Sequence, residues 1–218
     1  MLFGNLDAVT VVLRIPALLM AFTFHEFGHA WVATLLGDDT PRAQGRLTLS
    51  PLSHIDPLGA LLILVTGFGW ARPVQVNPSR LRFRPWGDIA VSLAGVAMNF
   101  LLGLLFYGLL LLAWKGLFGP NPVIARLFWE IVSLNLLLIG FNLIPVPPLD
   151  GFRVIRYLFP RSMDQVVYTL YRMGPVLLML VLMTQWTAPV MHWIADHLLI
   201  VIHALVFPPV NYLYNLLR

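Results

Sequence analysis

The sequence predicts an all-α, multi-pass membrane protein that forms one domain over residues 1–218. Hydrophobic residues make up 59% of the chain, charged residues only 11%, and the mean hydropathy is +0.80. A chain with so little polar surface is not expected to face water on all sides. Several apolar runs also reach the length of about 20 residues that crosses a hydrocarbon core of about 30 Å. The sequence contains no internal repeat, and no appended soluble domain is expected.

Five apolar segments are long enough to span the membrane. They lie at residues 8–36, 88–114, 123–144, 166–186 and 188–207. The first is not expected to be a cleavable signal peptide, because no basic residue precedes Arg14, the run is too long and no small-residue cleavage site follows it. The motifs described below fall within residues 20–160, and residues 166–207 form a C-terminal helical part.

The connection between the first two segments is predicted to contain a short insertion. Residues 57–66, PLGALLILVT, are apolar but too short to span, which favours a half-inserted or re-entrant segment. On either side, RLTLS (46–50) and PVQVN (73–77) alternate with a period of two, which predicts strands. Pro73 lacks an amide donor, so the second stretch would be an edge strand.

The placement of arginine predicts the orientation in the cell membrane. The connections 37–87 and 145–172 are rich in arginine, and the positive-inside rule therefore makes them cytoplasmic. Their arginines are Arg42, Arg46, Arg72, Arg80, Arg82, Arg84, Arg153, Arg156, Arg161 and Arg172. Five crossings then place the N-terminus outside and the C-terminus in the cytoplasm, with Lys115 and Arg126 on the outer side. Arg14 is expected to snorkel or to face a partner helix.

The first apolar segment contains FHEFGHA at residues 24–30. His25 and His29 are four residues apart, so they project from one helix face with Glu26 beside them, which is the H-E-x-x-H pattern of metal sites. In such sites two imidazoles hold a zinc ion while the carboxylate takes a proton from the attacking water. This chain's composition predicts only about 0.0015 such patterns by chance, a guard against the false positives of short motifs. The alternative is a polar cluster that only hydrogen-bonds between helices.

A zinc site needs a third protein ligand, and without cysteine that ligand must be His, Asp or Glu. The best candidate is Asp150 in FNLIPVPPLDG (141–151), whose prolines end the helix and leave irregular backbone that must lie beside protein or a water-filled cavity. In the alternative interpretation, Asp150 caps a short helix, FRVIRYLF. The predicted topology favours the ligand, because the third segment returns to the cytoplasmic side, where His25 and His29 lie at a depth of roughly 10 to 17 Å.

Three further stretches complete a resemblance to a known family. Besides HEFGH at 25–29, the chain carries NLIPVPPLDG at 142–151, GRLTLSPLSHIDPLG at 45–59 and SLAGVAMN at 92–99. Together they resemble the site-2 protease family of intramembrane zinc metalloproteases, in a compact form without an added soluble regulatory domain. The resemblance covers most of residues 20–160, and the first two motifs in this order and spacing are highly specific to the family.

The resemblance implies roles for individual residues. The implied ligands of one zinc ion per chain are His25, His29 and Asp150, and Glu26 is the implied catalytic carboxylate. Asn99 and Asn142 match family asparagines that position the substrate or its oxyanion. Val96 departs from the family pattern, since many relatives carry proline there.

Other polar residues have structural explanations that stand beside functional ones. Asn99 shares a helix face with two glycines four residues away on either side, which also fits close helix packing with one hydrogen bond. His54 and Asp56 are candidates for supporting contacts to a ligand histidine, although an aspartate before Pro57 is also an ordinary turn residue. The histidines of the last segment fit packing or interface roles better than metal ligation. They are His192, His197 and His203.

The predicted reaction is hydrolysis of peptide bonds in a membrane protein, with Glu26 as general base. A substrate helix must unwind first, and a strand at 46–50 or 73–77 would capture it by β-augmentation. The expected partners are a transmembrane protein substrate and the lipid bilayer, with no nucleic acid. Two alternatives use the same ligands: a zinc-dependent hydrolase of a non-peptide substrate, which needs no edge strand, and a non-catalytic zinc-binding scaffold or transporter, which does not need Glu26.

Overall fold

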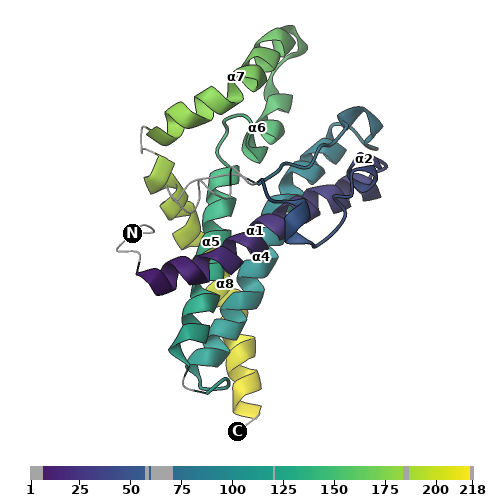
Figure 1. The fold of residues 1–218 in the computed structure, drawn as a ribbon. Coiled ribbons are helices and arrows are strands. Elements are labelled where there is room, and N and C mark those ends of the chain that lie inside the picture. The colour runs from purple at the N-terminus through teal and green to yellow at the C-terminus, as the bar shows by residue number, and fades with distance from the viewer. Residues whose placement is uncertain (1–6, 57–58, 60–70, 120, 184–186, 217–218) are drawn as a thin grey trace.

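The computed structural model describes residues 7–56, 59, 71–119, 121–183 and 187–216 (Figure 1). Four of the described helices are long and apolar enough to cross a membrane, which confirms the predicted class. They are α1 (Ala8–Leu35), α4 (Trp86–Trp114), α5 (Pro122–Asn142) and α8 (Thr187–Leu216). The predicted fifth span falls on α7 (Asp164–Met183) and on residues 184–186, which lie outside the described part, so a count of five stays a prediction. The shorter helices are α2 (Thr40–Ala43) and α6 (Asp150–Ile155).

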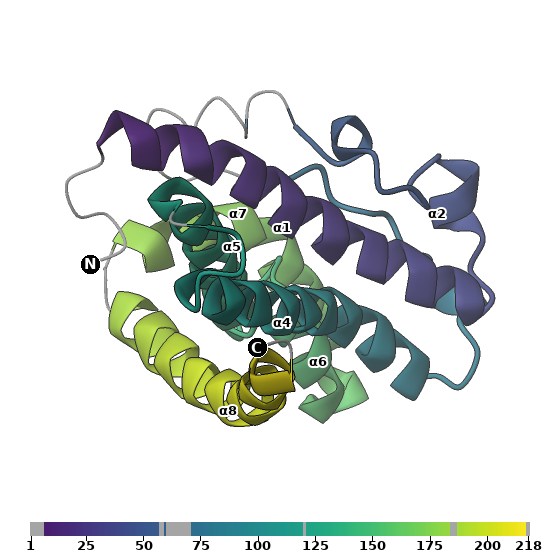
Figure 2. The same cartoon turned by 90° about the horizontal axis from the view of Figure 1, so that it is seen from below.

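The long helices pack around α4 and α5, which run antiparallel through the centre of the bundle. Figure 2 shows α1 on one side of this pair and α8 on the other. The apolar core lies between α4, α5 and α8 and includes Leu110, Val132, Leu136, Ile139 and Ile202. On the side of α4 away from α8, α1 packs against α4, and polar side chains of these two helices, such as His25 and Asn99, meet there.

The C-terminal end of α8 lies at one end of the bundle, whereas five crossings predicted it at the other end, beside the arginine-rich connections. Near its start, Met191 is packed against Gly140 at the end of α5, and near its other end Asn211 accepts a hydrogen bond from Lys115 Nζ at 2.8 Å. The helix thus runs antiparallel to α5 and ends beside the α4–α5 connection, away from the arginine-rich connections. It also continues nine residues beyond the predicted boundary at 207, through Pro208 and Pro209. Packing of its last turns against α4 explains why these prolines do not end it.

Polar contacts fix how α1 enters the bundle. Asp7 caps its first turn by accepting from the amide of Thr10 at 2.7 Å, and Arg126 of α5 pairs with the same carboxylate at 2.8 Å. Seven residues after Asp7, Arg14 Nε donates to Glu130 Oε2 of α5 at 2.9 Å. The prediction that Arg14 faces a partner helix is therefore confirmed.

The two predicted strands are wrong for the described residues, where the only strand-like contact is an isolated bridge between Ile55 and Ala71. Residues 46–50 are irregular instead, with a bend at 47–48. Residues 73–77 are extended, but side chains hold them in place of a partner strand: Val74 N–H donates to Glu26 at 2.8 Å and Asn77 N–H donates to Asp38 at 2.6 Å. Most of the predicted re-entrant segment, 57–66, lies outside the described residues.

Candidate metal centre

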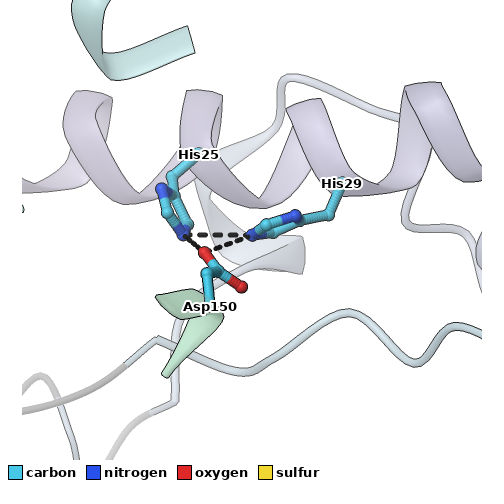
Figure 3. Close-up of side chains that lie close together, drawn as sticks. All are labelled: His25, His29 and Asp150. Atoms are coloured by element: carbon cyan, nitrogen blue, oxygen red, sulfur yellow. Dashed lines mark hydrogen bonds and ion pairs between the residues drawn. The ribbon is translucent and has the colours of Figure 1, made fainter. Parts of the chain in front are cut away.

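Two histidines of α1 meet one aspartate of α6 inside the protein. His25 and His29 project from the same face of α1, as their spacing predicts, and their rings point toward the Asp150 side chain (Figure 3). All three residues are buried, with 6%, 5% and 7% of their surface exposed. They form the one group of potential metal ligands found among the described residues.

The end of α5 delivers Asp150 to this position. The helix ends at Asn142, immediately before the proline-containing turns, and the chain reverses over residues 143–149 before α6 begins. Gly151 permits the tight return, because a Cβ atom there would lie 2.4 Å from the carbonyl oxygen of Leu143. Asp150 is the first residue of α6 and its side chain makes no capping hydrogen bond. The structure therefore favours the interpretation in which Asp150 faces the histidines over the one in which it caps a helix.

Three acceptor atoms converge at the centre of the cluster. His25 Nε2 and His29 Nε2 are 3.1 Å apart, and Asp150 Oδ2 lies 3.3 Å from the first and 3.2 Å from the second. Nitrogen and oxygen ligands at about 2.0–2.2 Å from a tetrahedral zinc ion are separated by about 3.3–3.6 Å. The three atoms are thus placed close to one triangular face of such a site, with the fourth position free of these residues.

Hydrogen bonds on the far side of each ring fix which nitrogen faces this point. His25 Nδ1 is 3.2 Å from Asn99 Oδ1, and His29 Nδ1 is 2.7 Å from the carbonyl oxygen of Val91. Because both partners are acceptors, each Nδ1 carries the proton and each Nε2 keeps its lone pair. When both rings are neutral, two lone pairs and a carboxylate oxygen cannot hydrogen-bond to one another, and Asp150 Oδ2 is buried without a hydrogen-bond donor among the described residues. The donor set therefore fits a bound cation.

Asp150 is held in the form that binds cations. Burial alone would raise its pKa, but positive charge at the centre, such as that on a protonated His29 or His25, outweighs burial and holds the pKa of this carboxyl well below its usual range. The side chain is therefore a carboxylate at neutral pH. A carboxylate with two imidazoles is a ligand set that zinc accepts in catalytic sites.

The backbone of α4 forms the floor beneath the two rings. A Cβ atom on Gly95 would lie 2.6 Å from both His25 Cε1 and His29 Nε2, so a side chain at this position would displace both imidazoles. The sequence interpretation assigned Gly95 only to helix packing. Its position four residues before Asn99, on the same helix face, was the available signal that it also lies under the histidines.

Glu26 lies next to the ligands and is not one of the three convergent groups. It is 8% exposed, and its Oε2 accepts from the amide of Val74 at 2.8 Å. No partner for Oε1 is found in the part of the chain that the structure describes. One carboxylate oxygen is therefore used to hold the side chain, and the other is available to an incoming molecule.

The other predicted site residues make their described contacts away from the three convergent side chains. Asn142 donates from Nδ2 to the carbonyl of Leu138 in its own helix at 3.0 Å, so none of its described contacts joins it to the three ligands. His54 is fully buried and bonds through Nε2 to the carbonyl of Thr48 at 2.8 Å, which braces the insertion. Its supporting role at a ligand histidine stays a prediction. Asp56 accepts from the amide of Gly59 at 2.9 Å, as in a turn.

Two of the three histidines of α8, His197 and His203, make packing contacts, in line with the preferred interpretation, and the role of His192 stays a prediction. His203 Nδ1 lies 2.7 Å from the hydroxyl of Tyr107, and its ring stacks on Phe207. His197 bonds to the carbonyl of Trp193 one turn earlier at 2.7 Å.

Sequence reasoning missed one buried charge near the centre. Asp88, in the first turn of α4, has no exposed surface and binds three side chains that follow Asp150 in the chain. Its partners are Arg153, Arg156 and Tyr157. From the sequence, the two arginines count only toward the positive-inside rule, and no local spacing links them to a residue more than sixty positions earlier.

Several known proteins that are similar in sequence to this chain are named as zinc metalloproteases. A Bacillus subtilis protein named "Putative zinc metalloprotease YwhC" is 45% identical over 149 residues, which cover 66% of this chain and 67% of that protein. A Mycobacterium tuberculosis protein named "Putative zinc metalloprotease Rip2" is 30% identical over 202 residues, covering 85% of this chain and 73% of that protein.

An archaeal protein extends the similarity. The Methanocaldococcus jannaschii protein named "Putative zinc metalloprotease MJ0611" is 28% identical over 162 residues, which cover 71% of this chain and 75% of that protein. No protein-family profile matches the chain. No solved structure shows significant similarity to it.

Proposed function

Because the chain belongs to the family of zinc metalloproteases that contains these bacterial relatives, we propose that it is an intramembrane endopeptidase of the site-2 protease type. Its substrates would be other membrane proteins, which it cuts in or near their membrane-spanning segments. One observation carries the proposal: His25 and His29 lie buried on a helix long and apolar enough to span the bilayer, and the buried Asp150 of α6 converges on them. Ionisable side chains inside a membrane cost free energy, so they are rare and usually mark a functional site.

We assign His25, His29 and Asp150 as the ligands of one zinc ion per chain. When bound, zinc would polarise the scissile carbonyl and make the attacking water more acidic. The hydrogen bonds from the two Nδ1 atoms to Asn99 and Val91 keep both rings in the tautomer that this role needs.

Glu26 would be the general base. Its Oε2 is held by the amide of Val74, and its Oε1 would accept a proton from the attacking water and later deliver it to the leaving amine. The same amide comes from the extended segment 73–77, so the base and the segment beside it are positioned together.

Two asparagines remain candidates for contacts with the substrate. Asn99 Nδ2 is buried without a hydrogen-bond partner in the described part of the chain, although the same side chain holds His25 through Oδ1. A substrate carbonyl or oxyanion would satisfy this donor. Asn142 would need to release the carbonyl of Leu138 before it could act in the same way.

We further propose an orientation in which the arginine-rich connections are cytoplasmic, the N-terminus is outside and the active site opens toward the cytoplasm. For the C-terminus we replace the cytoplasmic location predicted from five crossings. The contact between Lys115 and Asn211 favours the outer side, where the α4–α5 connection lies in this orientation.

The extended segment 73–77 is our candidate for the surface that captures an unwound substrate. Gln75 is exposed, and its amide has no hydrogen-bond partner among the described residues. A substrate strand would pair with this free edge and lie beside Glu26, which binds the preceding residue.

Replacing Gln75 by proline is expected to slow cleavage of a membrane-spanning substrate by roughly 3- to 10-fold, the effect of one lost backbone hydrogen bond. Gln75→Ala is the matched control, since it removes the same side chain and keeps the amide. Initial cleavage rates of both variants, with zinc content measured alongside, test the idea. Equal rates for the two variants would show that the segment does not pair with the substrate.

The proposed function is tested directly by metal removal. Purified protein in detergent or liposomes is expected to cut single-span peptides, to lose this activity after treatment with a zinc chelator and to regain it when zinc is returned. Cleavage of lipids or other non-peptide compounds in place of peptides would indicate the alternative hydrolase. Zinc binding without any cleavage would indicate a scaffold or transporter.

A further inference from the structure

Asp88 occupies a fully buried position where α4 meets the segment that follows Asp150. Its Oδ1 accepts from Arg153 Nη2 at 3.3 Å, and its Oδ2 accepts from Arg156 Nη2 at 2.6 Å and from the hydroxyl of Tyr157 at 2.5 Å. The hydroxyl of Tyr157 also accepts from Arg156 at 2.6 Å. Both carboxylate oxygens are thus used, and all three donors come from α6 or the turn after it.

Two of the three donors share a helix face with the metal ligand. Arg153 and Tyr157 follow Asp150 by three and seven residues, so the three side chains lie on one side of this short helical stretch. A helix of six residues is not stable by itself. Its position, and with it the direction of the Asp150 carboxylate, must be set by contacts with another element.

The same face of α4 also carries the groups that hold the histidines. Asp88 is followed at helical spacing by Val91, Gly95 and Asn99, which contact or support His29 and His25. One helix thus touches both elements that supply ligands. The histidines of α1 rest on its middle, and the α6 segment is tied to its first turn.

We propose that Asp88 is a positioning residue that fixes Asp150 in the metal centre by clamping the α6 segment to α4. The inference rests on the proposed assignment of Asp150 as a metal ligand. The clamp needs a neutral tyrosine, and burial followed by the hydrogen bond to Asp88 raises the pKa of Tyr157, so that its hydroxyl remains a donor. Without the clamp, α6 has no described ion pair to α4, and Asp150 would sample positions away from the two Nε2 atoms.

Metal binding by Asp88→Asn and Tyr157→Phe tests this proposal. Zinc affinity is measured by competition with a chelator of known affinity, and the cobalt-substituted proteins are compared by visible absorption, which reports coordination geometry. Both variants are expected to bind zinc about 10- to 100-fold more weakly, as for other residues that orient a ligand. Their cobalt spectra are expected to differ from the native spectrum, because water replaces a loosely held Asp150 and changes the ligand set.

The control is Glu130→Gln, which removes the negative charge of another ion pair between helices, α1 and α5, away from the centre. It is expected to lower thermal stability and to leave zinc affinity and the cobalt spectrum unchanged. If Asp88→Asn does not fold, Tyr157→Phe still decides, because it removes one hydroxyl and keeps the ring. Native zinc affinity and a native spectrum in Tyr157→Phe, as in the control, would overturn the clamp. Failure of the unmodified protein to bind zinc would instead overturn the metal centre itself.

Discussion

Glu26→Gln is expected to abolish peptide cleavage while zinc stays bound. The glutamine side chain has the same shape, and its amide oxygen can still accept from Val74, so the local structure is preserved. It cannot take up a proton. Removing a general base typically costs about 10²- to 10⁴-fold in rate, and we expect a loss toward the upper end, because the site offers no other free carboxylate among the described residues. Single-turnover cleavage of a labelled single-span peptide measures this loss.

The chain contains its own control for this variant. Glu130 is the only other glutamate and is buried to the same degree, at 8% exposure, but it binds Arg14 on the far part of α1. Glu130→Gln should cut peptides at close to the native rate. A Glu26→Gln protein that retains zinc and cleaves near the native rate would refute the mechanism given above.

Asp150→Ala is expected to lose both zinc and activity. The two imidazoles alone provide fewer protein ligands than catalytic zinc sites use. The loss of affinity should therefore exceed the roughly 10- to 100-fold effect that is usual for residues outside the ligand set. Zinc content after dialysis, measured by mass spectrometry, and peptide cleavage are the two readouts.

Asp164→Ala provides the comparison for Asp150→Ala. Asp164 is exposed at the start of α7, so its removal should change neither zinc content nor cleavage. A fully zinc-loaded Asp150→Ala protein would show that another residue completes the site and that the contact with the histidines has a structural role.

Much of the candidate metal centre could be predicted from the sequence, because the patterns that indicate it lie within short stretches of the chain. The four-residue spacing of His25 and His29 fixes their common helix face, and the prolines before Asp150 fix the end of α5. The first three spanning helices follow from long apolar runs in the same way, with boundaries within two residues of those observed. Each of these features depends on neighbours in the chain.

The misjudged features depend on contacts between distant residues. Residues 73–77 have the alternation of a strand, but pattern alone does not supply a partner strand, and the side chains of Glu26 and Asp38 bind them instead. The buried position of Asp88 depends on three donors more than sixty residues later. The direction of α8 depends on its packing against α4 and α5, which hydropathy does not encode.

The assembly of the centre on α4 has a consequence for how the protein is made. The first helix leaves the ribosome with His25, Glu26 and His29 before Asn99 exists, and 121 residues separate His29 from Asp150. At about 5–20 residues per second, Asp150 follows roughly 6–24 s later. During that interval the nascent chain has no complete ligand set. Under the proposed function, a newly made molecule would therefore not cut itself or neighbouring nascent helices until its third long helix and the Asp150 segment after it have been made.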